Sequence, residues 1–226
     1  MSKDHSFTRK GFNYFISNGR LTLGSSTNLF LNAVNDSSVR KHSLVLESHI
    51  GKRRVKDINT NAFRAVKGNN DEFIEILDIQ EGFERILEHA FRDQCNIKTV
   101  IIPESVYQIS EAAFHLHNLT SGRDGQITTT FIFRGKSKLR TLDSMAISGQ
   151  ESIIISIAVY KDIIADESIT YLQAKTLNVF TPLGTKFSNI DTIKSMNDFS
   201  VNRVATCKKR NRLDITFSLL FIFILK

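Results

Sequence analysis

Residues 97–114, IKTVIIPESVYQISEAAF, carry the pattern from which the architecture of this 226-residue chain can be inferred. Val100 and Ile102 are separated by one residue, which is the spacing of a short strand with one buried face. Pro103 follows at once, and we expect it to end the strand because proline cannot donate a ladder hydrogen bond. The stretch therefore begins with a short, half-buried strand.

The rest of the stretch predicts a return of the chain. Val106 and Ile109 lie three residues apart, which fits a turn-like or helical return. Ala113 and Phe114 then fall where the unit must close. A small alanine allows close approach of the backbone, and we expect the phenylalanine ring to stack on an equivalent ring in the next unit.

The closing phrase recurs along the chain as I-x-x-x-A-F. It occupies residues 58–63, 86–91 and 109–114, and a weakened copy, LDSMAI, occupies 142–147. The starts are 28, 23 and 33 residues apart, so the smallest unit has 23 residues and the longer intervals hold insertions of five and ten. Apolar positions upstream also align at a shift of 23, with Ile97, Val100, Ile102, Val106 and Ile109 matching Ile74, Leu77, Ile79, Phe83 and Ile86.

A unit this short cannot bury its own apolar face, whereas stacked units can, so that stability becomes a sum over neighbouring interfaces. We therefore predict stacked units in which Phe63, Phe91 and Phe114 share one continuous core. The alternative is an ordinary α/β core in which the spacing is a coincidence. The first unit supplies Leu44, Leu46, Val55 and Ile58 for the same roles, and the fourth supplies Phe131, Phe133, Leu139 and Leu142.

These phrases resemble the leucine-rich repeats of the BspA-like surface antigens, whose unit reads L-x-x-I-x-I-P-x-x-V-x-x-I-x-x-x-A-F. Residues 97–114 match every fixed position of that pattern with a residue of the same kind. Residues 74–91 match it except that Gln80 stands in place of the proline, and Cys95 lies near the cysteine of the family. Residues 131–148 resemble a longer form of the unit.

The resemblance implies a right-handed leucine-rich-repeat solenoid of α/β to mostly β class, with a parallel sheet on its concave face and short turn or helical returns. It covers residues 41–200, with clear repeats over 44–147 and degenerate repeats over 153–190, where further strands are expected. Such proteins are associated with cell-surface adhesion and protein binding, and none of the repeat positions is catalytic. The resemblance thus implies a non-enzymatic adhesion or protein-binding module, with an intracellular scaffold as the alternative.

The two flanks lie outside the clear repeats. Residues 1–40 are expected to form an amino-terminal cap, in which Asn18-Gly19 between apolar runs is a strong hairpin signal because both residues tolerate positive φ. Residues 201–226 combine a basic segment with a nearly unbroken apolar run over 213–225. Three interpretations of that run stay open: a last buried strand or docked segment, a truncated membrane anchor, or a reading-frame accident.

The same flanks leave the localisation open. Residues 1–20 hold no apolar run of the kind found in a secretory signal peptide. The carboxyl-terminal run is about half as long as the roughly 20 apolar residues that a membrane-spanning helix needs. The resemblance implies a cell-surface location, with membrane association through the carboxyl-terminal tail, whereas the lack of a visible signal peptide favours the cytoplasm.

Motifs of catalysis or cofactor binding are lacking. The two cysteines, Cys95 and Cys207, cannot form a disulfide framework, and the chain has no phosphate-binding glycine loop, no G-x-S-x-G and no H-E-x-x-H. A metal or acid–base site could be assembled only from His89, Asp93, Cys95, His115 and His117. Because His115 and His117 follow the Ala-Phe turn, we expect them at the surface, and we predict no enzyme activity, no cofactor and no metal.

Charge favours acidic partners without naming one. Thirty basic residues against 23 acidic residues give a net charge of +7. Basic side chains cluster at 52–56, KRRVK, and at 208–212, KKRNR. Neither cluster is interleaved with aromatic residues on which bases could stack, so nucleic-acid binding is the less favoured alternative and solvated loops are the simpler interpretation. Asn35 and Asn118 fit the N-glycosylation pattern, which matters only on a secretory route.

Four residues are our candidates for protein binding on the concave face. Glu75, Asp78, Lys98 and Ile101 occupy strand positions of two central units that we expect to be exposed. Variation at such positions sets specificity on a scaffold that is already rigid. The ligand and the oligomeric state cannot be inferred from these residues.

Overall fold

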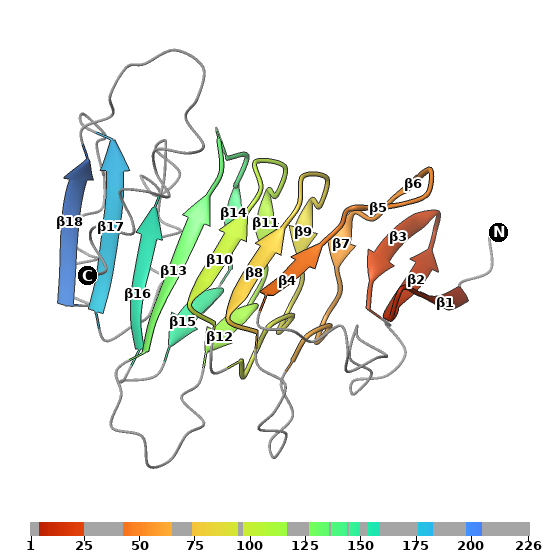
Figure 1. Cartoon of the computed structure of the whole chain (residues 1–226), viewed down its shortest axis with the longest axis horizontal. Helices are drawn as coiled ribbons and strands as arrows, with labels where there is room; N and C mark the ends of the chain where they lie inside the picture. The colour runs from red at the N-terminus through yellow and green to blue at the C-terminus, as the bar shows by residue number, and fades with distance from the viewer. Residues whose placement is uncertain are drawn as a thin grey trace.

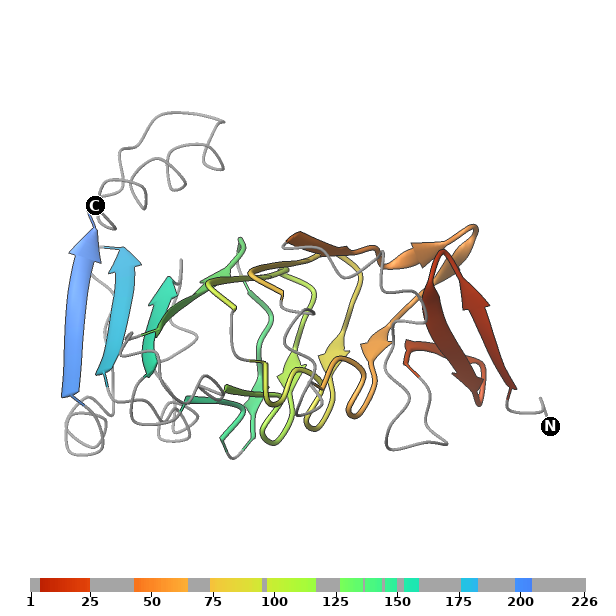
Figure 2. The same ribbon diagram turned by 60° about the horizontal axis from the view of Figure 1, so that its bottom comes forward.

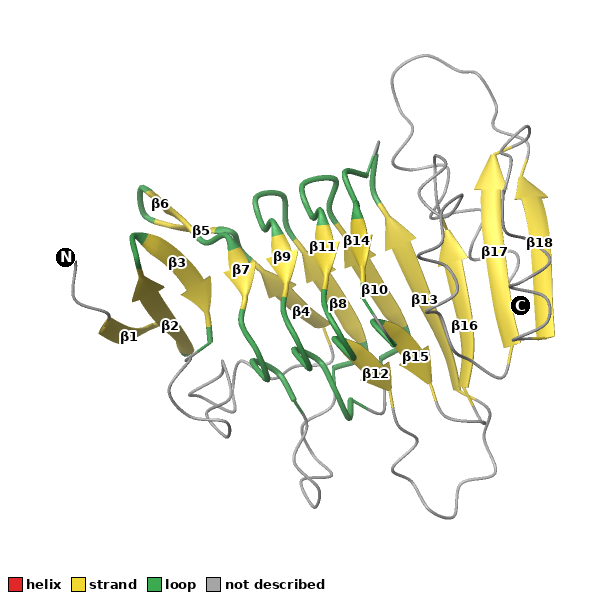
Figure 3. Ribbon diagram, turned by 180° about the vertical axis from the view of Figure 1, so that it is seen from behind, coloured by secondary structure: helices red, strands yellow, loops and turns green. Residues whose placement is uncertain are grey.

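The computed structural model is built from strands and turns. It describes residues 5–24, 43–64, 74–94, 97–116, 127–135, 137–143, 145–149, 153–158, 176–182 and 198–204. Within these ranges the chain contains no helix (Figure 3). Its strands are β1 (His5–Arg9), β2 (Phe12–Ser17), β3 (Arg20–Leu23), β4 (Ser43–Leu46), β5 (His49–Ile50), β6 (Arg53–Arg54), β7 (Asp57–Ile58), β8 (Ile76–Ile79), β9 (Arg85–Ile86), β10 (Thr99–Ile102), β11 (Gln108–Ile109), β12 (Phe114–Leu116), β13 (Ile127–Phe133), β14 (Thr141–Leu142), β15 (Ile147–Gly149), β16 (Ile153–Ala158), β17 (Thr176–Pro182) and β18 (Asp198–Val204).

Two seven-stranded sheets contain most of these strands (Figure 1). Sheet A has the order β1-β2-β3-β7-β9-β11-β14, and sheet B has the order β18-β17-β16-β13-β10-β8-β4. All the pairings in sheet B are parallel, as are those of sheet A from β3 onward. The chain passes from a strand of sheet B to a two-residue strand of sheet A and back, so the strands stand in rows along the molecule (Figure 2).

The pairing register confirms the repeat alignment. Val100 in β10 lies opposite Leu77 in β8, and Ile109 in β11 lies opposite Ile86 in β9. Both pairs are offset by 23 residues, which is the repeat length inferred from the sequence. β10 ends at Ile102, immediately before Pro103, as the missing donor of proline requires.

Apolar side chains of both sheets meet in one core. Leu77, Val100 and Phe131, which follow one another across sheet B, have no exposed surface. Ile86 and Ile109 are equally buried on the facing strands of sheet A. Burial of about 1.5–3 kcal/mol per large aliphatic side chain makes this continuous interior the main stabilising contribution.

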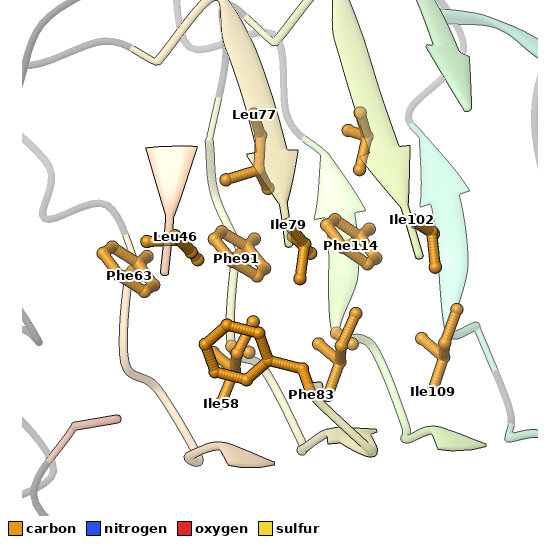
Figure 4. Close-up of a cluster of buried hydrophobic side chains, with 14 of the residues drawn as sticks. Leu46, Ile58, Phe63, Leu77, Ile79, Phe83, Phe91, Ile102, Ile109 and Phe114 are labelled. Carbon is orange, nitrogen blue, oxygen red and sulfur yellow. The ribbon is translucent and has the colours of Figure 1, made fainter. Parts of the chain in front are cut away.

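The phenylalanines of the closing phrase form a stack through that core (Figure 4). The rings of Phe63 and Phe91 are 5.0 Å apart and inclined by 1°, and those of Phe91 and Phe114 are 5.0 Å apart and inclined by 2°. Phe12 meets one end of the stack edge-on at 6.5 Å, and Phe131 meets the other end edge-on at 5.3 Å. The predicted stack is therefore confirmed, and an edge-on ring closes each end.

The residue before each closing alanine has a left-handed backbone. Asn61, His89, Ala112 and Met145 all have φ between 49° and 57°, and each is followed by a buried alanine. The turns are joined to one another by backbone hydrogen bonds, for example from the amide of His89 to the carbonyl of Glu111 at 3.1 Å. A side chain larger than alanine would keep these turns apart, which explains the alanine of the phrase.

The amino-terminal strands extend sheet A beyond the repeats. β2 and β3 form an antiparallel hairpin through Asn18 and Gly19, both at positive φ, and β3 then pairs in parallel with β7. An ion cluster fixes this junction, because the fully buried carboxylate of Asp57 accepts hydrogen bonds from the guanidinium groups of Arg20 and Arg85. Burial alone would raise the pKa of Asp57, but the two arginines hold it below its usual range.

Two expectations need adjustment. The returns of the second and third units contain the two-residue strands β9 and β11, and the helical alternative does not occur in them. His115, which we expected at the surface after the Ala-Phe turn, is half-buried in the strand β12 and paired with Ser148. The backbone resumes ladder pairing with the following unit directly after the closing phrase, which the sequence pattern did not indicate.

The carboxyl-terminal half continues sheet B. β16 and β17 are the further strands expected within 153–190, and β18 runs across residue 200. Several features of the sequence lie outside the described residues: Asn35, Cys95, His117, Asn118, the loop up to Gln126, Cys207, the basic segment 208–212 and the apolar run 213–225.

Candidate binding surface

The outward side of sheet B is the surface on which the sequence placed candidate residues. Strand alternation turns Leu77 and Ile79 into the core, so Ile76 and Asp78 face outward. Val45 and Ile76 are 49% and 43% exposed and are the large apolar side chains most open to solvent in the described part of the chain. Neighbouring outward residues are in register: Ser43, Ile76 and Thr99 form one row, which is continued by the buried Thr130, and Val45, Asp78, Ile101 and Ile132 form the next row.

Two of the four candidates, Asp78 and Ile101, are direct neighbours on this surface. They lie opposite each other between β8 and β10, and Val45 of β4 lies opposite Asp78 on its other side. Both are half-buried, because adjacent parallel strands shield part of each side chain. The structure thus places an acid between two aliphatic residues in one row.

The other two candidates, Glu75 and Lys98, immediately precede the strands β8 and β10. The Nζ of Lys98 lies 3.1 Å from Oε1 of Glu75, and the Lys98 side chain is 65% exposed. An ion pair this open to solvent contributes about 0–1 kcal/mol. We therefore regard the pair as the edge of the surface, where its charges are available to a partner at little cost.

Arg134 belongs to the same surface, although the sequence analysis did not single it out. It follows β13, and its Nη2 lies 3.3 Å from each carboxylate oxygen of Asp78. Because β10 separates β13 from β8, this ion pair crosses strand β10. A charge pair 56 positions apart in the chain leaves no local pattern, and only the strand order could have revealed it.

The candidate metal residues do not form a site in the described part of the chain, where no group of three or more suitable ligands occurs. Burial, together with the nearby charge of Arg92, lowers the pKa of His89, so its ring stays neutral at physiological pH. The Nδ1 of His115 is 2.7 Å from the hydroxyl of Ser148, which satisfies that nitrogen within the fold. The contacts of His89 and His115 are therefore those of residues that stabilise the fold.

A cavity of about 200 Å³ lies beside this surface, where the amino-terminal strands of sheet A meet the edge strand of sheet B. Its lining is mixed: Phe12, Tyr14 and Leu46 contribute apolar surface, and the exposed ion pair of Lys10 and Glu47 contributes charge. Burial and the charge of Glu47 raise the pKa of Tyr14 to about 12. The phenol that Tyr14 contributes to the cavity is therefore neutral near pH 7.

Stacked parallel-strand units, a phenylalanine core and an outward side that varies from unit to unit define a repeat protein. Residues 33–120 match the model of the BspA type Leucine rich repeat region, in six copies, which confirms over that stretch the resemblance inferred from the sequence. No curated protein and no solved structure matches the chain. Repeats of this family commonly mediate protein interactions and are generally non-enzymatic.

Among the residues that the structure describes, there is no helix of the length and apolar character needed to cross a bilayer.

Proposed function

We propose that this protein is a non-enzymatic adhesion module that binds another protein through the outward side of sheet B. In this proposal the repeats continue as a right-handed solenoid over residues 41–200, and residues 1–40 cap its first unit. Glu75, Asp78, Lys98 and Ile101 belong to the contact surface.

The exposed apolar residues of sheet B carry the proposal. Val45 and Ile76 lie on a sheet whose backbone is fixed by pairing on both sides of β8. A partner that covers them removes apolar surface from water, worth about 25 cal/mol per Å², while the sheet itself loses little conformational freedom. The ion pairs around them add orientation more than affinity.

The test is a binding screen of the purified full chain against surface and matrix proteins. A partner that uses this surface should bind the double variant V45R/I76R at least about tenfold more weakly, because two charges are placed in the apolar contact. Thr141→Arg is the control for an arginine placed on the other sheet, since Thr141 is an exposed strand residue of sheet A. A partner lost with Thr141→Arg but retained by V45R/I76R would contradict the proposed surface.

The alternative is an intracellular scaffold that uses the same surface. Protease treatment and surface labelling of intact cells separate the two versions. Cleavage and labelling of the protein support adhesion. A protein that remains protected and fractionates as soluble supports the scaffold.

A further inference from the structure

The first repeat unit contains an insertion that the neighbouring units lack. In the second unit the chain advances by 7 positions from Ile79, the last inward residue of β8 in sheet B, to Ile86, the apolar residue of β9 in sheet A. The corresponding distance in the first unit, from Leu46 to Ile58, is 12 residues. The five additional residues allow the short antiparallel hairpin of β5 and β6, which projects at the edge of the sheets (Figure 1).

Contacts with the second unit hold this hairpin in place. Arg54 donates from Nε to the carbonyl of Gly82 at 2.9 Å, and the hydroxyl of Ser48 donates to the carbonyl of Glu81. Gly82 has φ of +121°, and a side chain there would overlap Ser48, so the close approach requires glycine. The insertion is consequently a supported element with a defined position.

The exposed part of the hairpin is basic. Gly51, Lys52, Arg53 and Arg54 are all exposed, and the guanidinium of Arg9 from β1 reaches within 3.9 Å of the position that a Gly51 side chain would occupy. Lys52, Arg53 and Arg9 have no ion-pair partner among the residues that the structure describes. Nearby carboxylates are engaged elsewhere.

Two acidic residues near the hairpin, Glu47 and Glu81, bind other groups of the protein. Glu47 pairs with Lys10 at 3.3 Å. Glu81 accepts hydrogen bonds from the backbone amides of Glu104 at 2.6 Å and Ser105 at 3.2 Å. The positive charge of the hairpin is therefore not neutralised by these neighbours.

We infer that this basic hairpin, with Arg9 beside it, binds the sulfate groups of an anionic polysaccharide. Guanidinium groups form paired hydrogen bonds with planar or tetrahedral oxyanions, and a fixed hairpin presents them without a large ordering cost. Residues 51–54 include no aromatic ring for base stacking and no apolar residue for insertion into a membrane. A flexible sulfated chain can bring successive groups to such a small cationic footprint.

Binding of a labelled heparin fragment to the full-length protein tests this inference. The double variant K52E/R53E reverses two hairpin charges and should weaken heparin binding by at least about tenfold at low ionic strength. The double variant K138E/R140E is matched to it: it causes the same change in net charge, and it lies in the equivalent segment between β13 and β14 of the fourth unit, where both residues are exposed. We expect that control to bind within about twofold of the parent protein.

Each other outcome contradicts the inference in a distinct way. An equal loss in both double variants would mean that overall charge, not the hairpin, governs binding. Absence of heparin binding at low salt would show that the hairpin does not bind sulfated polysaccharides. Tighter binding to duplex DNA or to phosphatidylserine vesicles than to heparin would replace the polysaccharide with a different partner. Circular dichroism of each variant verifies that the fold is retained.

Discussion

Replacement of Phe91 by alanine should destabilise the protein more than any change to an exposed residue of the same unit. Phe91 is fully buried, and both faces of its ring are stacked, on Phe63 and on Phe114, at 5.0 Å. Loss of a buried phenylalanine side chain costs about 3–5 kcal/mol of unfolding free energy. Each stacked pair adds about 0.5–1.5 kcal/mol beyond burial, so we expect the upper half of that range.

Two further substitutions separate stacking from burial. Phe91→Leu keeps most of the apolar volume but removes both ring faces, and it should cost about 1–2 kcal/mol. Phe12→Ala removes a half-buried ring that touches the stack only edge-on at 6.5 Å, and its cost should be clearly below that of Phe91→Ala. The expected order of destabilisation is therefore Phe91→Ala first, with both other variants well behind.

Urea unfolding followed by circular dichroism measures these differences, because the slope of the unfolding free energy with urea shows whether the unfolding reaction itself has changed. His89→Ala is the reference variant, since His89 is two residues away and its ring lies outside the stack. A large cost at His89 together with less than about 1 kcal/mol at Phe91 would refute the stacked register.

Three further predictions concern the turns, the ion cluster and the cavity. Ala112→Gly should stabilise the protein by about 0.5–1 kcal/mol in urea unfolding, because glycine relieves the left-handed backbone at φ 49°, whereas Ala113→Gly should destabilise it. Asp57→Asn should cost about 2–4 kcal/mol of unfolding free energy at pH 7, because it leaves two arginines without their carboxylate. The pKa of Asp57 is depressed in the folded protein, so the stability that its carboxylate contributes is complete above the unfolded pKa of about 3.9 and is lost as the pH falls through the folded pKa. Between pH 6 and pH 3 the parent protein should therefore lose more stability than the variant. In an ultraviolet titration Tyr14 should ionise at about pH 12, later than an unperturbed tyrosine, and Glu47→Gln should lower that pKa, as the removal of a nearby negative charge requires.

The sequence predicted the parts of the fold that every unit must share. Residues such as Val100 and Phe114 face equivalent residues of the adjacent units, so the same shape is required at each step and the pattern becomes visible as a repeat. The strands, their 23-residue register and the phenylalanine stack followed from it. The resemblance to BspA-like repeats depends on the same positions and was confirmed over residues 33–120.

Other features arise from contacts between distant segments. The ion pair of Asp78 and Arg134, and the cluster of Asp57 with Arg20 and Arg85, join residues that no local spacing relates. The left-handed position before each closing alanine is also not evident from residue types, because four different positions are filled by asparagine, histidine, alanine and methionine. Tertiary hydrogen bonds between the turns impose that conformation regardless of the side chain.

The difference between interior positions, which every unit shares, and outward positions, which vary, explains how binding surfaces can differ along the molecule. Backbone ladders join each unit to the next, as between Val100 and Leu77, and they depend little on which side chain faces outward. The outward row can therefore contain Val45, then Asp78, then Ile101 without any change in the interior behind it. An insertion is tolerated for the same reason, provided that the chain returns in register, as the 12-residue passage of the first unit does when Ile58 meets Ile86. Outward residues and inserted hairpins are consequently the two places where this architecture can acquire binding specificity at little cost in stability, and the apolar surface of sheet B and the basic hairpin use one of them each.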